Sequence, residues 1–191
     1  LIVADGNATV GIMARQDPYG EGLLQYTAEP LAEAGAEVLN DGGIVYDPAA
    51  ENFDAEVGEI VAADPDAFVM IGFEESAQIL TSLFEAGYKQ GDKNIYLVDG
   101  NIGNALAENF TEPGILEGIR GTLPSAEVSQ EFKDRLLEVD PALEDYSYAP
   151  ENYDAIIITA LAAEVAGQFV HERILGAAQR RRPRAGGRAG R

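Results

Sequence analysis

The hydrophobic pattern alternates between short apolar runs, typical of strands, and longer stretches in which apolar residues recur at helical spacing. Residues 66–72 (DAFVMIG) form a continuous apolar run, as expected of a strand buried on both faces of a parallel sheet. Pro30 lies inside a helical stretch and predicts a kink or a short break there. The pattern predicts strands at residues 9–13, 36–39, 43–46, 66–72, 95–98 and 115–123, and helices at 19–34, 53–63, 77–87, 126–139 and 150–166.

The regular alternation of strands and helices with short connections predicts the fold class. Such an order is typical of a doubly wound α/β fold, a mostly parallel sheet flanked by helices and similar to a Rossmann lobe. No apolar run approaches the length of about 20 residues that a membrane-spanning helix needs.

Charge divides the chain into two parts. The formal net charge of the 191 residues is -20, yet residues 168–191 contain seven Arg and one acidic residue, Glu172. We therefore predict an acidic body at 1–167, whose charge argues against nucleic-acid partners, and a basic low-complexity tail at 168–191. The tail has two interpretations: a segment that binds nucleic acid or a membrane surface, or a foreign or frame-shifted sequence without structure.

The sequence offers little for catalysis. It contains no Cys, and its one His, His171, lies in the basic tail, so neither a catalytic triad nor a thiolate or histidine metal site is predicted. Gly20 and Gly22 begin like a dinucleotide loop, but Gln25 stands where the third glycine belongs. We expect a binding protein without cofactor or metal rather than an enzyme.

Four groups of residues stand in a characteristic order over about 150 positions. They are residues 10–13 (VGIM) with 17–22 (DPYGEG) and 33–38 (EAGAEV), residues 46–48 (YDP) with 52–54 (NFD), residues 62–67 (AADPDA) with 72–73 (GF), and residues 97–100 (LVDG) with 152–155 (NYDA). In this order they resemble the branched-chain amino-acid-binding family of ABC-transporter substrate-binding proteins, and the resemblance implies a ligand-binding lobe at 1–167.

The resemblance implies the second lobe of a type I periplasmic-binding fold, without a recognisable first lobe. It further implies a solute-binding component of an ABC importer that traps an aliphatic or branched-chain amino acid, or a related amide, between two lobes. The implied partners are the missing first lobe and a membrane permease, and the implied location is periplasmic or extracellular, lipid-anchored or secreted. The alternative is a ligand-sensing domain of a receptor or repressor with the same fold. We also expect that the uncovered surface pairs two copies of the chain into a homodimer.

Three loops follow predicted strands and are expected to lie side by side, at residues 15–20, 72–76 and 99–104, because ligands of open α/β sheets bind beyond the carboxyl ends of strands. Asp99 is the first candidate, since a carboxylate in a closed cleft pairs with an ammonium group and the resemblance places an acidic residue in this loop. The alternative is that Asp99 only forms a turn before Gly100.

The other candidate ligand-binding residues are Tyr19, Phe73, Glu74 and Asp17. Tyr19 offers an apolar wall and a hydroxyl, unless it only packs at the start of its helix. Phe73 is either a second wall or a core residue. Glu74 either contacts ligand or, like Glu75, complements the positive end of the helix that it begins. Asp17 belongs to the loop motif that precedes Tyr19.

Overall fold

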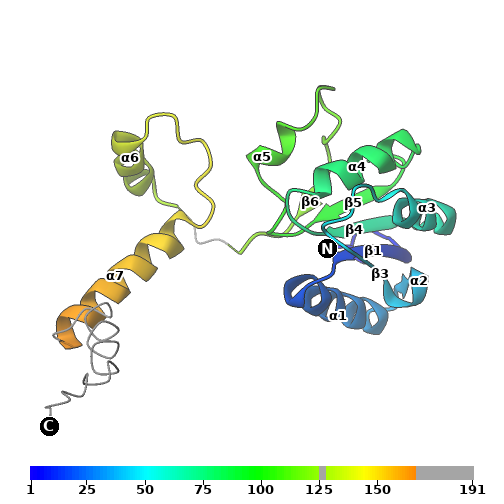
Figure 1. The fold of residues 1–191 in the computed structure, drawn as a ribbon, viewed down its shortest axis with the longest axis horizontal. Coiled ribbons are helices and arrows are strands. Elements are labelled where there is room, and N and C mark those ends of the chain that lie inside the picture. The colour runs from blue at the N-terminus through cyan, green and yellow to red at the C-terminus, as the bar shows by residue number, and fades with distance from the viewer. Residues whose placement is uncertain (125–127, 167–191) are drawn as a thin grey trace, which may run out of the picture. The chain divides into compact units, whose positions relative to one another are not determined.

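The computed structural model describes residues 1–124 and 128–166 (Figure 1). The chain divides into two compact units, Leu1–Pro124 and Ser125–Arg191. The predicted body at 1–167 spans the first unit and the described part of the second, which holds the two C-terminal helices. The predicted basic tail at 168–191 lies outside the described residues.

Six strands of the first unit form a parallel sheet, which confirms the predicted fold class. The strand order is β2-β1-β4-β5-β6, and β3 pairs with β1 beyond the end of β2. The strands are β1 (Thr9–Arg15), β2 (Glu37–Val38), β3 (Ile44–Tyr46), β4 (Ala67–Ile71), β5 (Asn94–Leu97) and β6 (Arg120–Gly121).

The central pair of strands is β1 and β4, with Val10 opposite Ala67 and Ala14 opposite Ile71. All five residues of β4 are buried, because helices cover both faces of the sheet. Asp66 anchors the start of this pair. Its carboxylate accepts the backbone N–H groups of Ala8 and Thr9 at 3.0 and 2.9 Å, and its own N–H donates to the Thr9 hydroxyl at 2.9 Å.

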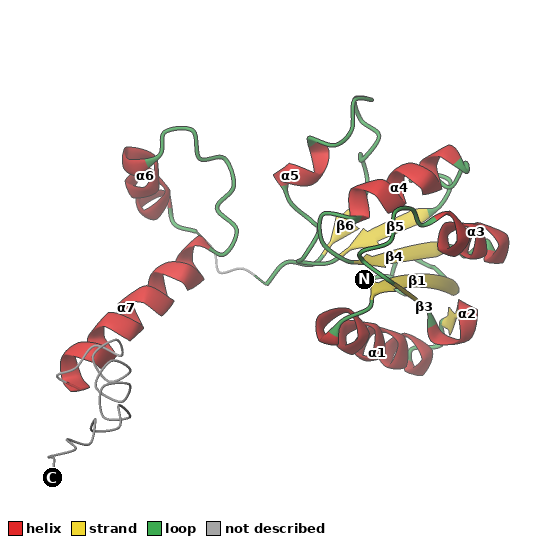
Figure 2. Cartoon of the chain, viewed as in Figure 1, coloured by secondary structure: helices red, strands yellow, loops and turns green. Residues whose placement is uncertain are grey.

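Helix α1 (Pro18–Glu33) covers one face of the sheet, and α3 (Asp54–Ala63) and α4 (Ser76–Glu85) cover the other (Figure 2). Two apolar cores result, one on each face, because side chains of successive strand residues point to opposite sides. Helix α1 runs through Pro30 without a break, although the sequence predicted a kink or break there.

Three local predictions differ from the structure. The strand predicted at 36–39 ends at Val38 and is followed by a short helical turn, α2 (Leu39–Gly42), in which Asn40 and Asp41 have left-handed φ angles of 55° and 53°. The predicted strand at 115–123 is reduced to the two residues of β6. The short helix α5 (Asn104–Ala107) was not predicted.

The described part of the second unit contains α6 (Gln130–Val139) and α7 (Ala149–Ala166), close to the predicted helices. Helix α7 is apolar over most of its circumference and leaves large side chains exposed, including Ile156 at 68% and Leu161 at 60%. Within residues 1–124 and 128–166, none of the helices combines the length and apolar character that a bilayer crossing requires.

Candidate functional site

The candidate site lies where β1, β4 and β5 end, since these neighbouring parallel strands deliver their following loops to the same edge of the sheet. The loops at 15–20, 72–76 and 99–104 meet there, as predicted. We call this edge the rim. It is the place where open parallel sheets bind ligands.

Tyr19, Phe73 and Asp99 come together on the rim, one from each loop. The Tyr19 hydroxyl donates a hydrogen bond of 2.8 Å to Asp99 Oδ1. The rings of Tyr19 and Phe73 stack with their centroids 5.0 Å apart and an angle of 19° between their planes. Phe73 remains 38% exposed, so it is not the core residue of the alternative interpretation. The cluster joins an aromatic surface to a carboxylate.

Arg15 is the residue that sequence reasoning missed, although it lies within the first predicted loop. Its Nε contacts Asp17 Oδ2 at 2.5 Å and its Nη1 contacts Glu75 Oε1 at 2.9 Å. The guanidinium carbon lies 4.2 Å from the centroid of the Phe73 ring, a cation–π distance. A charged residue at the end of a buried strand was the available signal.

Glu75 Oε1 also accepts the Tyr46 hydroxyl at 2.8 Å and the Phe73 backbone N–H at 3.2 Å. Burial, reinforced by the hydrogen bond to Glu75, raises the pKa of Tyr46 far above its usual range, so this phenol stays protonated and donates. One oxygen of Glu75 thus accepts three hydrogen bonds, from Arg15, Tyr46 and Phe73. Glu75 therefore does more than complement the positive end of its helix.

Asp17 and Glu74 occupy different positions from the aromatic cluster. Asp17 caps α1 by accepting the Gly20 N–H at 2.8 Å, and this hydrogen bond, with Arg15 adding to it, lowers the pKa of the Asp17 carboxyl. Glu74 is exposed, and its contribution among the described backbone contacts is a carbonyl that accepts the Ala77 N–H at 3.2 Å. Asp17 therefore supports the loop that carries Tyr19.

A buried amide fixes the third loop to the sheet. Asn101 accepts the Val98 N–H at 2.9 Å and donates to the Met70 carbonyl at 3.0 Å and the Ser76 hydroxyl at 2.9 Å. These bonds hold the turn that contains Asp99 against the end of β4. Gly100 permits this close approach, because a Cβ atom there would lie 2.7 Å from both the Gly72 carbonyl oxygen and the Phe73 ring.

The charges of the rim favour a cationic ligand group. Arg15 is the only cation in the three loops, and it already contacts two carboxylates, those of Asp17 and Glu75. Asp99 and Glu74 add further negative charge. A ligand ammonium group is therefore attracted to this edge, whereas a ligand carboxylate is not.

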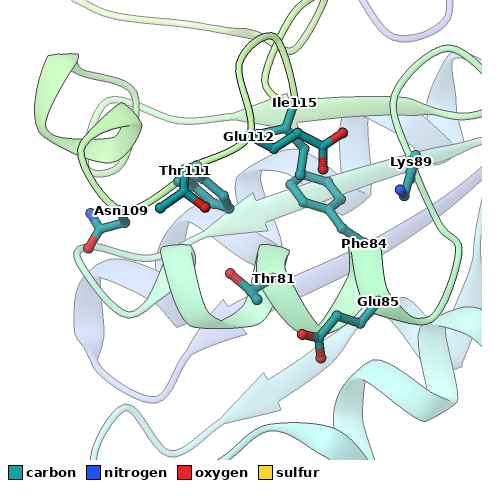
Figure 3. A pocket seen from close by; sticks show the side chains of 9 residues that line it. Thr81, Phe84, Glu85, Lys89, Asn109, Thr111, Glu112 and Ile115 are labelled. Atoms are coloured by element: carbon teal, nitrogen blue, oxygen red, sulfur yellow. The ribbon is translucent and has the colours of Figure 1, made fainter.

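A pocket of about 320 Å³ lies elsewhere, between the second half of α4 and residues 109–115 (Figure 3). Phe84 and Ile115 supply apolar surface, and the exposed side chains of Glu85, Lys89 and Glu112 surround it. We place the candidate site on the rim instead, because strand ends and polar side chains from three loops converge there. Among residues 1–124 and 128–166, no three acidic or histidine side chains gather in a way that suits a metal ion.

No protein-family model and no curated protein matches the sequence. Solved structures do match the fold. A leucine binding protein LivK from Thermotoga maritima has a TM-score of 0.72 and 23% identity, covering 91% of this chain and 49% of its own. A fatty acid ABC transporter substrate-binding protein from Thermomonospora curvata has a TM-score of 0.68 and 16% identity, covering 87% of this chain and 44% of its own.

A type 1 periplasmic binding protein from Bordetella pertussis has a TM-score of 0.60 and 19% identity, covering 72% of this chain and 37% of its own. The chain has the α/β fold of these ligand-binding receptors, so the predicted resemblance is confirmed at the level of the fold. The chain spans half or less of the length of each of these structures.

Proposed function

We propose that this chain forms one side of the ligand cleft in the solute-binding component of an ABC importer. The observation that carries the proposal is the joining of Tyr19, Phe73 and Asp99 at the carboxyl ends of adjacent parallel strands. The fold shared with substrate-binding proteins supports it. The proposed role is binding rather than catalysis, at the periplasmic or extracellular side of a membrane whose permease receives the ligand.

The proposed ligand is an aliphatic, branched-chain amino acid. Asp99 would pair with its ammonium group, and the aromatic surface of Tyr19 and Phe73 would cover part of its apolar side chain. Glu74 would add attraction at the mouth of the site, and Asp17 would act by holding the Tyr19 loop. The ligand carboxylate would be bound by the opposite lobe, because Arg15 is already paired with two acids.

One side of a cleft provides only part of the binding free energy. We therefore expect the 191-residue chain to bind L-leucine with a Kd in the millimolar range, or about 4 kcal/mol. The exposed apolar side chains of α7 would support self-association at high concentration in the absence of the opposite lobe. Light scattering on a concentration series checks this, and a monomer at every concentration would contradict it.

Titration of the ¹⁵N-labelled chain with L-leucine, followed by NMR, tests the proposed site. We expect shifts concentrated at the amides of Tyr19, Phe73 and Asp99, and their loss in Asp99→Asn. Asp92→Asn is the matched control, because it removes one negative charge from an exposed loop before β5 rather than after it. If both variants weaken L-leucine binding equally, the effect comes from the net charge of the chain and not from Asp99 itself. Shifts with sugars instead of L-leucine would favour the sensing-domain alternative.

A further inference from the structure

The ion pair between Arg15 and Glu75 connects parts of the rim that are sixty residues apart in the sequence. Both side chains are largely enclosed, with 16% and 14% of their surface exposed. Enclosure of this kind costs desolvation energy, so an enclosed pair persists where each partner has several well-placed hydrogen bonds. Both partners meet that condition.

We propose that Arg15 and Glu75 are positioning residues, which set the orientation of the Phe73 ring for ligand binding. Glu75 accepts the backbone N–H of Phe73 and thereby fixes where its side chain departs from the chain. Arg15 lies over the ring of the same residue at 4.2 Å. The pair therefore acts on Phe73 from the backbone and from the ring at once.

Arg15 also acts on Tyr19, through Asp17. Arg15 contacts Asp17, whose other oxygen caps the helix on which Tyr19 lies, and Tyr19 stacks on Phe73 and donates to Asp99. One guanidinium thus links both rings of the aromatic surface. Lysine retains the charge at this position but lacks the planar group that stacks on a ring and bridges two carboxylates. Since the inference assigns these residues a role in ligand binding, it rests on the proposed function.

The experiment compares Arg15→Lys with the matched variant Arg120→Lys. Arg120 also pairs with a carboxylate, that of Asp5, and lies 5.3 Å over an aromatic ring, that of Tyr96, but it is outside the three rim loops. Both variants replace a planar guanidinium, which contacts a carboxylate and lies over an aromatic ring, by an ammonium group. Only Arg15→Lys alters Phe73.

We expect Arg15→Lys to weaken the nuclear Overhauser effects between the Phe73 and Tyr19 rings in the ligand-free chain. It should also weaken L-leucine binding about fivefold, because a displaced Phe73 ring would cover less of the ligand's apolar side chain, by about the area of one methylene group. Arg120→Lys should lower the melting temperature comparably and leave the ring contacts and the affinity unchanged. Glu75→Gln, which retains an acceptor for Tyr46 and Phe73 but not the charge, should give a smaller effect of the same kind.

A Phe73→Ala background separates positioning from general destabilisation. If Arg15 acts through Phe73, Arg15→Lys should change the affinity in this background by less than about twofold, since coupled residues are non-additive. The same fivefold loss in the Phe73→Ala background, or unchanged ring contacts in Arg15→Lys, would overturn the positioning role. Failure of the unmodified chain to bind L-leucine would instead count against the proposed function, and the ligand-free ring contacts would still decide the orientation of Phe73.

Discussion

Replacing Asn101 by Ala tests whether a buried amide holds the Asp99 turn against the sheet. The Asn101 side chain is 7% exposed, and its loss removes the partners of the buried Val98 N–H and Ser76 hydroxyl. Leaving a buried polar group unpaired costs about 1–3 kcal/mol. With two such groups, we expect the free energy of unfolding to fall by about 3 kcal/mol.

Urea unfolding followed by circular dichroism measures the total loss. Because the chain has two units, hydrogen exchange at the amides of β4 and β5 reports on the first unit specifically. Asn52→Ala is the control, since Asn52 is exposed and accepts one N–H, that of Asp54, at 3.3 Å. If the two variants lie within about 1 kcal/mol of each other, the unpaired-group reasoning is wrong.

Three further predictions concern the rim and the sheet. Tyr19→Phe removes the hydroxyl that donates to Asp99 but keeps the ring, so the free energy of unfolding should fall by about 1 kcal/mol in urea titrations; no change would show that the bond is not stabilising. Backbone N–H groups at the start of β1 lower the pKa of Asp66. The carboxylate therefore stabilises the fold at a pH above the pKa of an unfolded Asp, and this stabilisation is lost as the pH falls through the pKa of Asp66 in the folded chain. Asp66→Asn should therefore flatten the acid side of a stability–pH profile, and an unchanged slope would contradict this. Gly100→Ala should lower the melting temperature, at a cost of about 1–3 kcal/mol for the close contacts of its Cβ, whereas Gly58→Ala on α3, where the Cβ meets open space, should raise it; equal shifts would refute the steric argument.

The sequence was sufficient to predict the layers of the first unit. The strands β1, β4 and β5 are short apolar runs buried on both faces, and the helices between the strands show one-sided spacing, so local patterns coincide with the tertiary arrangement. Residues 115–123 were predicted wrongly because their apolar side chains pack on the core from a loop, where alternation carries no information about backbone pairing. The sequence predicts the helix α7 but not what it packs against, because its apolar body shows only that it needs a partner surface, not which one.

The candidate site was also predicted in part. The strand order brings the three loops together, and their position after predicted strands was enough to expect them side by side. The pairing of Arg15 with Glu75 depends on the register between β1 and β4 and on the rotamers of two long side chains, neither of which a single sequence encodes locally. Asn101 was missed because its importance comes from burial beside two polar groups of distant parts of the chain, the Met70 carbonyl and the Ser76 hydroxyl.

The interruption between β2 and β3 leaves the sheet without a long unpaired strand at this edge. Left-handed residues Asn40 and Asp41 divide this outer edge into strands of two and three residues, and the opposite edge ends in the two residues of β6. A long, flat, unpaired strand would offer a continuous row of backbone donors and acceptors to another molecule. Both borders of this sheet are too short for that, so strand addition from a neighbouring chain has no template at either edge.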